Sequence, residues 1–387
     1  MKTIYTAFSL LFALQLYAEL PESQLTAEYT LTGTETLTDS PYEIAGSGTL
    51  NIGRDAQGTG TLNINYSSAT TNVFYGSGTI NVGTDATSGY LNVTGTNPDF
   101  PEMQYKTIMN YSGTINVNSL GLLSINGYIP SQWSEIVDIR NLNLEGMFTV
   151  SASKNSVSYI QISNLNFYEG ANLSSSQDFR TGTNAVWNIY GGDITFKTLR
   201  VGNTTAGNAT INLKGEDVLR NVSDVSMDTN DVTLNLNVDN YPNTINKLSF
   251  CDDCMLNINL SADRSETSNL SILSLTSKNA VASISGASIA IENFANDTIF
   301  IGDSNGVTID ENKIYLKDLD MYISVTAYAG ETDDSQIFGD WSLDWNESMQ
   351  LFALNNSAIP EPSSIAFIMG IASLLAARAK AYCGKRR

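Results

Sequence analysis

The sequence predicts an all-β protein, and more narrowly a single-stranded parallel β-helix (a β-solenoid). A unit of strand, glycine, polar turn and strand recurs along the chain. Short segments alternate apolar with polar residues, as strands do. Thr, Ser, Asn and Gly are abundant, whereas there are only 8 prolines and 16% charged residues. This composition favours strands and tight turns over helices.

The recurring unit begins at Leu50, Ile80 and Leu199, where the chain reads LNIGRDAQGTGTLNI, INVGTDATSGYLNV and LRVGNTTAGNATINL. Within each strand segment the apolar residues fall on alternate positions, so they share one face. A glycine follows the first triplet of each unit. Glycine turns the chain sharply at no steric cost, so we expect a corner there.

Strands this short cannot bury an apolar face alone, but stacked coils can. With about 20–25 residues per coil, inward Leu, Ile and Val would form the core. Outward or corner Asn and Thr would stack in ladders between coils. The repeats resemble those of autotransporter passengers and bacterial adhesin rods, which implies a solenoid fold and no particular activity. A β-sandwich of antiparallel hairpins is the alternative.

The chain is expected to have four segments. Residues 1–18 form a signal peptide and residues 19–297 form the solenoid body. Longer strand-like runs in residues 298–354 predict a terminal β cap that protects the open edge of the solenoid. Residues 355–387 form a linker and a C-terminal tail.

The N-terminal segment has the features of a secretory signal. Lys2 precedes an apolar stretch from Ala7 to Leu16, and a cut is expected after Ala18. The stretch is too short to span a membrane comfortably. The sequence therefore predicts export across the inner membrane.

The tail combines a Pro-Glu-Pro triplet, an apolar run and a basic end. Pro360 and Pro362, on either side of Glu361, exclude a helix because each fixes φ and lacks an N–H. The run from Ile365 to Ala377 predicts a short transmembrane helix of about 20 Å, below the ~30 Å of a bilayer core. Basic residues would hold the end of the chain on the cytoplasmic side: Arg378, Lys380, Lys385, Arg386 and Arg387.

This tail resembles the PEP-CTERM sorting signal of Gram-negative bacteria that make exopolysaccharide. The resemblance rests on the triplet, the span and the basic cluster, and it covers the tail only. It implies an exosortase-type membrane protease as a partner, which cuts near the triplet. It also implies transient inner-membrane anchoring and a final location at the cell surface or in the extracellular matrix.

Charge and composition exclude several functions. The chain has 40 Asp and Glu against 20 Lys and Arg, a net charge of −20, and no histidine. So acidic a surface repels nucleic acid phosphates, and we expect no nucleic-acid partner. The absence of histidine removes the commonest general base and most zinc sites. Any catalysis would have to rest on carboxylates, Lys, Arg or Tyr.

Cys251-Asp-Asp-Cys254 is the local motif most suggestive of chemistry. The two aspartates should raise the pKa of the thiols, which opposes a redox role. Too few further Cys or His residues exist to complete a zinc site. In an oxidising exterior, we expect Cys251 and Cys254 to form a small structural disulfide.

Acidic clusters are candidates for catalytic or calcium sites, because β-helix enzymes that cut polysaccharide use Asp or Glu with Ca²⁺ or a Lys or Arg base. Solvated turns explain them better, so no catalytic residue, no metal site and no cofactor is assigned. Weak Ca²⁺ binding on the acidic surface stays an alternative. The candidates are Asp303, Asp318, Asp320, Glu331, Asp333 and Asp334.

The function we expect is that of an exported, non-enzymatic structural or adhesion protein of the cell surface or extracellular matrix. Its expected partners are extracellular polysaccharide or other copies of itself. The alternatives are a polysaccharide lyase or hydrolase on the same rod, and a carbohydrate-binding protein. Two carboxylates and a Lys or Arg on adjacent coils, in a groove, would favour the enzyme. A flat aromatic strip would favour glycan binding.

Overall fold

A computed structural model describes most of the body of the chain. Residues 1–19 and 357–387 lie outside the described residues, and beyond residue 249 the model describes little more than the backbone of the strands. The described ranges up to that point are 20–21, 23–38, 41–53, 58–66, 74–95, 109–128, 134–153, 158–202, 207–227, 232–239 and 241–250.

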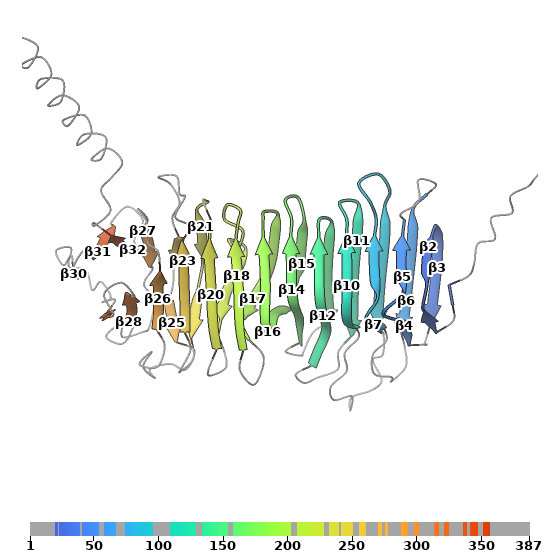
Figure 1. The fold of residues 1–387 in the computed structure, drawn as a ribbon, viewed down its shortest axis with the longest axis horizontal. Coiled ribbons are helices and arrows are strands. Elements are labelled where there is room, and N and C mark those ends of the chain that lie inside the picture. Colours follow the sequence, from blue (N-terminus) through green and yellow to red (C-terminus); the bar gives the residue numbers. More distant parts are fainter. Residues whose placement is uncertain are drawn as a thin grey trace, which may run out of the picture.

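The described body is a parallel β-solenoid, so the predicted fold class is confirmed and the β-sandwich is wrong. Strands that pair are in parallel register along almost the whole body, and the coils stack along the long axis of a rod (Figure 1). Each complete coil runs over three faces, which we name faces I, II and III in chain order. Parallel pairing along each face holds successive coils together.

Face I has the shortest strands. It comprises β1 (Gln24–Leu25), β4 (Tyr42–Ile44), β7 (Phe74–Gly76), the first halves of β10 (Met109–Val117), β12 (Ser134–Leu144), β14 (Ser158–Phe167) and β16 (Asp178–Ile189), the second half of β17 (Asp193–Arg200), β19 (Val222–Ser226), β22 (Leu248–Phe250) and β25 (Leu275–Ser277).

Face II continues from face I without a break in the four long strands. It comprises β2 (Glu28–Leu31), β5 (Thr49–Ile52), β8 (Thr79–Val82), the second halves of β10, β12, β14 and β16, then β18 (Gly207–Leu213), β20 (Val232–Val238), β23 (Met255–Leu260), β26 (Ser288–Glu292) and β28 (Lys313–Leu316).

Face III closes each coil. It comprises β3 (Gly33–Thr38), β6 (Gly60–Tyr66), β9 (Gly89–Gly95), β11 (Gly121–Tyr128), β13 (Met147–Ser153), β15 (Asn172–Ser175), the first half of β17, and further along β21 (Asn243–Ile245), β24 (Leu270–Ile272) and β27 (Thr298–Ile301).

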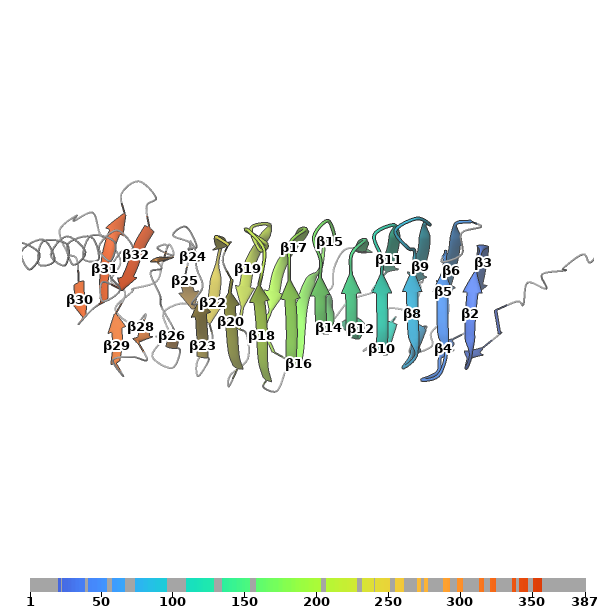
Figure 2. The same ribbon diagram turned by 45° about the horizontal axis from the view of Figure 1, so that its top comes forward.

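The C-terminal strands change to antiparallel pairing. β28 pairs with β29 (Met321–Ser324), and β27 pairs with β32 (Leu351–Asn356). β32 also pairs with β31 (Trp341–Asn346), which pairs with β30 (Gln336–Phe338). These strands follow the solenoid at its C-terminal end (Figure 2). Parallel pairing persists through β27 and β28, past the boundary expected at residue 297. That residues 298–354 act as a separate cap stays a prediction.

The core consists of inward rows of apolar side chains, one row for each inward position of a face. On face II, Leu50, Ile80 and Ile115 lie side by side in register, and all are fully buried. Larger side chains fill the corner near face I, where the rings of Tyr42, Phe74 and Tyr111 stack with centroids 6.3 and 6.0 Å apart. The predicted inward Leu, Ile and Val core is confirmed, with an aromatic column added to it.

The three copies of the sequence unit do not occupy equivalent places. The units at Leu50 and Ile80 stack in register and cross from face II to face III. The unit at Leu199 crosses from face I to face II instead. The reason is that strand, glycine, turn and strand describe a corner, and a three-sided coil has more than one corner.

The corner glycines are required by both conformation and space. Gly83 has φ +68°, a region that other residues adopt at a cost, and a Cβ there would lie 2.7 Å from the backbone nitrogen of Gly121 in the next coil. Gly53 and Gly202 also have positive φ, at 67° and 84°. The expectation that these glycines mark sharp turns is confirmed.

Among the described residues, no helix is long and apolar enough to span a membrane. The tail span expected from Ile365 to Ala377 lies outside those residues.

Candidate functional site: polar ladders and a charged face

The outward side of face II carries an asparagine ladder. Each asparagine stands between two inward apolar residues, so its amide points away from the core. The Nδ2 of each donates to the Oδ1 of the one before it at 2.6 to 2.9 Å, across 22 to 35 residues of sequence. The ladder comprises Asn51, Asn81, Asn116, Asn143, Asn166, Asn188, Asn212 and Asn237.

All the amides of this ladder point in the same sense, with donors toward the N-terminal end of the rod. Hydrogen bonds in such a chain polarise one another. At the donor end, Asn51 Nδ2 donates to Glu28 Oε1 at 2.8 Å, and also to Thr30 Oγ1 at 3.3 Å. A carboxylate at the donor end of aligned dipoles is favourable, as it is at a helix N-terminus. Glu28 is therefore the cap of the asparagine ladder.

Shorter ladders on other outward positions follow the same pattern. On face III, Asn92 donates to Asn63 at 2.9 Å, and Asn63 donates to Thr36 at 3.5 Å. On face II, Asn164 donates to Asn141 at 2.9 Å, and Asn141 to the carbonyl of Gly113 at 3.1 Å. The predicted stacking of Asn and Thr between coils is confirmed.

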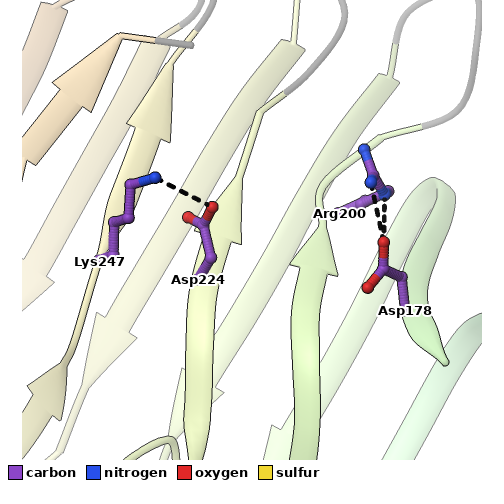
Figure 3. Close-up of polar contacts among 4 residues, drawn as sticks. All are labelled: Asp178, Arg200, Asp224 and Lys247. Carbon is purple, nitrogen blue, oxygen red and sulfur yellow. Dashed lines mark hydrogen bonds and ion pairs between the residues drawn. The ribbon is translucent and has the colours of Figure 1, made fainter. Parts of the chain in front are cut away.

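Face I carries a different kind of outward residue, and its charges gather toward the C-terminal coils. The Nη2 and Nε of Arg200 donate to Asp178 Oδ2 at 2.8 and 3.0 Å (Figure 3). Their side chains are only 15% and 14% exposed. Arg180 is the register partner of Arg200 on the preceding coil. The geometry of Arg200 and Asp178 is that of a shielded structural ion pair.

A second ion pair joins the next two coils. Lys247 Nζ is 3.6 Å from Asp224 Oδ2, and Ser249 Oγ donates to Asp224 Oδ1 at 2.8 Å (Figure 3). Asp224 is 19% exposed, whereas Lys247 is 43% exposed. We call Asp178, Arg200, Asp224 and Lys247 the ion-pair cluster. The two carboxylates and two cations thus lie on four successive coils of face I, and each carboxylate is bound by the cation of the next coil.

Asp138 lies on the same face, nearer the N-terminal end of the rod. Burial raises the pKa of its carboxyl above the ordinary value, and a hydrogen bond from Gln161 Nε2 at 3.3 Å partly lowers it. Asp138 and Gln161 are partners in register, and Arg180 follows Gln161 on the next coil. Gln161 therefore lies between Asp138 and Arg180 in this column of register partners.

Tyr168, Tyr190 and Lys214 lie next to one another at one corner of the rod, and we call these three residues the aromatic corner. The two rings stack with centroids 5.4 Å apart and planes 4° apart. Lys214 Nζ lies 4.7 Å from the centre of the Tyr190 ring, close enough for a cation–π contact. Each of the three residues is the first after its face II strand segment, where the backbone N–H still bonds to the preceding coil.

The predicted site residues fall outside the part of the chain that can be described. This holds for Cys251 and Cys254, for Pro360, Glu361 and Pro362, for the basic end of the tail, and for the acidic candidates from Asp303 to Asp334. Their roles stay predictions. Within the described ranges, no group of three or more His, Cys, Asp and Glu is placed to hold a metal ion.

Sequence reasoning did not find the ion-pair cluster or the aromatic corner. Asp178 and Arg200 are 22 residues apart, and coil lengths vary, so only the register brings them together. The fold and this outward surface define a β-solenoid whose outward polar side chains hydrogen-bond to one another between coils. Comparison with known proteins assigns nothing further: no protein-family model, no curated protein and no solved structure matches the chain.

Proposed function

We propose that this chain is an exported, non-enzymatic structural or adhesion rod of the cell surface or extracellular matrix. The tail with Pro360, Glu361 and Pro362 would deliver it, with an exosortase-type protease as processing partner and the inner membrane as a transient anchor. Its partners at the final location are extracellular polysaccharide or other copies of the rod. Nucleic acid is not among them, because the chain carries a net charge of −20.

The asparagine ladder is the observation that carries this proposal. Its amides bond to one another from Asn51 to Asn237, so the polar groups of face II stabilise the stack of coils. Such a surface is uniform along the rod and does not converge on one point. Uniform rods suit display and scaffolding, whereas catalysis needs polar groups aimed at one substrate atom.

The ion-pair cluster supports the same view. A glycosidase needs one carboxyl to give a proton and a second carboxylate to attack or to activate water. Asp178 instead accepts hydrogen bonds from Arg200, and Asp224 accepts one from Ser249 and forms an ion pair with Lys247. The cluster meets part of the pattern that favours an enzyme, namely a carboxylate with a cation on the adjacent coil, but its two carboxylates are two coils apart and its bonding favours a structural role.

The proposal is tested by deleting the protein in the cells that produce it. We expect the deletion to reduce the polysaccharide retained at the cell surface, with the length and composition of the sugar chains unchanged. Restoring the protein as Asp178→Asn should recover retention as fully as the native chain does. A change in sugar-chain length on deletion, recovered by the native chain but not by Asp178→Asn, would support the lyase or hydrolase instead.

The aromatic corner favours a second candidate, a carbohydrate-binding protein. Tyr168 and Tyr190 form a small stacked pair at a corner, and Lys214 adds a cation that suits acidic sugars. The two rings also pack against each other between neighbouring coils, and this contact alone would account for the presence of the tyrosines. The two readings are separated by whether the corner affects glycan binding or only stability.

That separation needs a matched pair of tyrosine variants. Tyr190→Ala should lower polysaccharide retention severalfold if the corner binds glycan. Tyr241→Ala is the control, because Tyr241 is a 50% exposed tyrosine on a later coil. Equal retention by both variants would leave the corner with a structural role. Repeating the assay with a chelator tests whether weakly bound Ca²⁺ bridges rod and polysaccharide.

A further inference from the structure

The N-terminal end of the rod is closed by a polar bridge across the top of the core. Tyr29 on β2 and Glu35 on β3 both occupy inward positions, in register with Leu50 and Leu62 of the next coil. The Tyr29 hydroxyl donates to Glu35 Oε1 at 2.7 Å, which joins face II to face III. Leu50 and Leu62 are fully buried, whereas Tyr29 and Glu35 are half-buried. The bridge is therefore a lid on the apolar rows.

Glu35 is a charged residue at the start of an inward row whose other members are all apolar. The inward row that begins at Glu35 continues with Leu62, Leu91, Leu123, Phe148, Leu173 and Ile194, all buried. A leucine at position 35 would extend that row to the end of the rod. The end strands β2 and β3 would then form an apolar edge whose free backbone groups invite a further strand.

Inward-pointing charges are one of the means by which natural proteins keep such edges from associating. The surroundings of Glu35 act in the same direction. Glu28 and Glu43 also lie on the first two coils, and among the described residues the first Lys or Arg is Arg140. Two N-terminal ends that approach one another therefore bring the carboxylates of Glu28, Glu35 and Glu43 together, with no Lys or Arg among the described residues of the first two coils.

The opposite end of the rod cannot continue the parallel register. There β28 pairs antiparallel with β29, and β27 pairs antiparallel with β32. The described strands of that end therefore offer no parallel edge to β2 and β3, whereas the same edge of a second copy can pair with them antiparallel. A twofold axis through the corner between faces II and III would pair β2 of each copy antiparallel with β3 of the other, which brings each Glu35 against the apolar rows of the other copy.

We propose that the edge formed by β2 and β3 can pair with the N-terminal end of a second copy, and that the charge of Glu35 prevents this association in the native protein. The native rod is single at this end. Removing the charge allows two copies to associate through this edge, as dimers joined end to end. This inference does not depend on the proposed function, because it concerns the edge and not the outward faces.

The test measures the mass of the exported protein by sedimentation. We expect the native protein to sediment as one chain and Glu35→Leu as two. Glu43→Gln is the matched control, because it removes a carboxylate from an outward position of the neighbouring coil and should leave one chain. Tyr29→Phe removes the hydrogen bond, keeps the charge and should also leave one chain. Hydrogen exchange should show new protection in β2 and β3 of Glu35→Leu, with β11 unchanged.

Glu35→Gln decides the matter if Glu35→Leu does not fold. It keeps an acceptor for Tyr29 and removes only the charge, so it should associate at least about tenfold more tightly than the native protein. Glu35→Leu or Glu35→Gln that is folded and single at the same concentration overturns the proposal. So does a native protein already paired through β2 and β3, or a Tyr29→Phe variant that pairs as strongly as Glu35→Leu.

Discussion

At the scale of single residues, the asparagine ladder shows how an outward polar side chain stabilises a solenoid. Its members are mostly half-buried, and Asn51 is only 2% exposed. An amide is suited to this place because it donates and accepts in the same column, so every rung repeats the last. An ionised Asp can only accept, and the side chain of Ser is too short to reach the next coil in the same way. The ladder thus explains why Asn recurs between apolar residues in this sequence.

Breaking one rung should cost measurable stability. Asn143 donates to Asn116 and accepts from Asn166, both at 2.7 Å. In Asn143→Asp the charged side chain cannot donate, so two acceptors face one another, and we expect a loss of about 1–3 kcal/mol. The measurement is urea unfolding of the purified body. Asn208→Asp is the control at an exposed position, with an expected change within about 0.5 kcal/mol. Equal losses in both variants would contradict a role for the ladder.

Two buried tyrosines give a prediction for alkaline pH. Within the described part of the chain, the hydroxyls of Tyr42 and Tyr111 have no hydrogen-bond partner, and burial raises the pKa of each well above its ordinary value. The folded chain keeps these protons where the unfolded chain releases them. Stability should therefore fall as pH rises above about 10, the ordinary tyrosine value.

Tyr111→Phe tests this directly. It removes the unsatisfied hydroxyl and should raise stability by about 1 kcal/mol or more at neutral pH. It should also flatten the alkaline decline measured by unfolding at several pH values. Tyr241→Phe, at an exposed site, should change neither quantity. A loss of stability in Tyr111→Phe would show that the hydroxyl has a partner after all.

At the scale of elements, the corner is the unit that the sequence repeats. The units at Leu50 and Ile80 stack as expected, but the unit at Leu199 lies one face further on. Local alternation and glycine define a strand and a corner. Alternation and glycine do not determine which of the corners of the coil a given unit forms. Coil lengths of 22 to 35 residues remove the strict period that would have supplied it.

Corner glycines should be intolerant of any side chain. Gly83→Ala combines positive φ with a Cβ 2.7 Å from the backbone of the next coil, so we expect a loss of about 2–4 kcal/mol. Gly58→Ala is the control, because a Cβ there meets no atom within 4 Å. The measurement is the midpoint of thermal unfolding. A tolerated Gly83→Ala would contradict the close approach of neighbouring coils.

The tail is an element that sequence alone describes. Pro360 and Pro362 should keep the triplet extended outside the membrane, because neither permits helix through it. Replacing both by Ala would extend the helix and hide the cut. We expect that variant to stay in the inner membrane near full mass after signal removal, while the native form appears outside, shortened by the tail. Equal release of both forms would leave a simple anchor, as would Arg387 retained at the final location.

At the scale of the whole molecule, the sequence was sufficient for the architecture and insufficient for the surface. Alternation, glycine and composition predicted parallel coils with an inward apolar core and outward Asn and Thr ladders. The pairing of Asp178 with Arg200, or of Tyr168 with Tyr190, depends on the register between coils. That register follows from loop lengths that differ from coil to coil, and no local pattern encodes it.

We propose that the rod holds polysaccharide without cutting it. The most direct measurement incubates the purified exported protein with the polysaccharide of the cells that make it. It follows both the protein that sediments with the polymer and the appearance of reducing or unsaturated ends. We predict that protein sediments with the polymer and that no new ends form. Release of ends that is lost in Asp178→Asn or Asp138→Asn would contradict the claim and establish an enzyme.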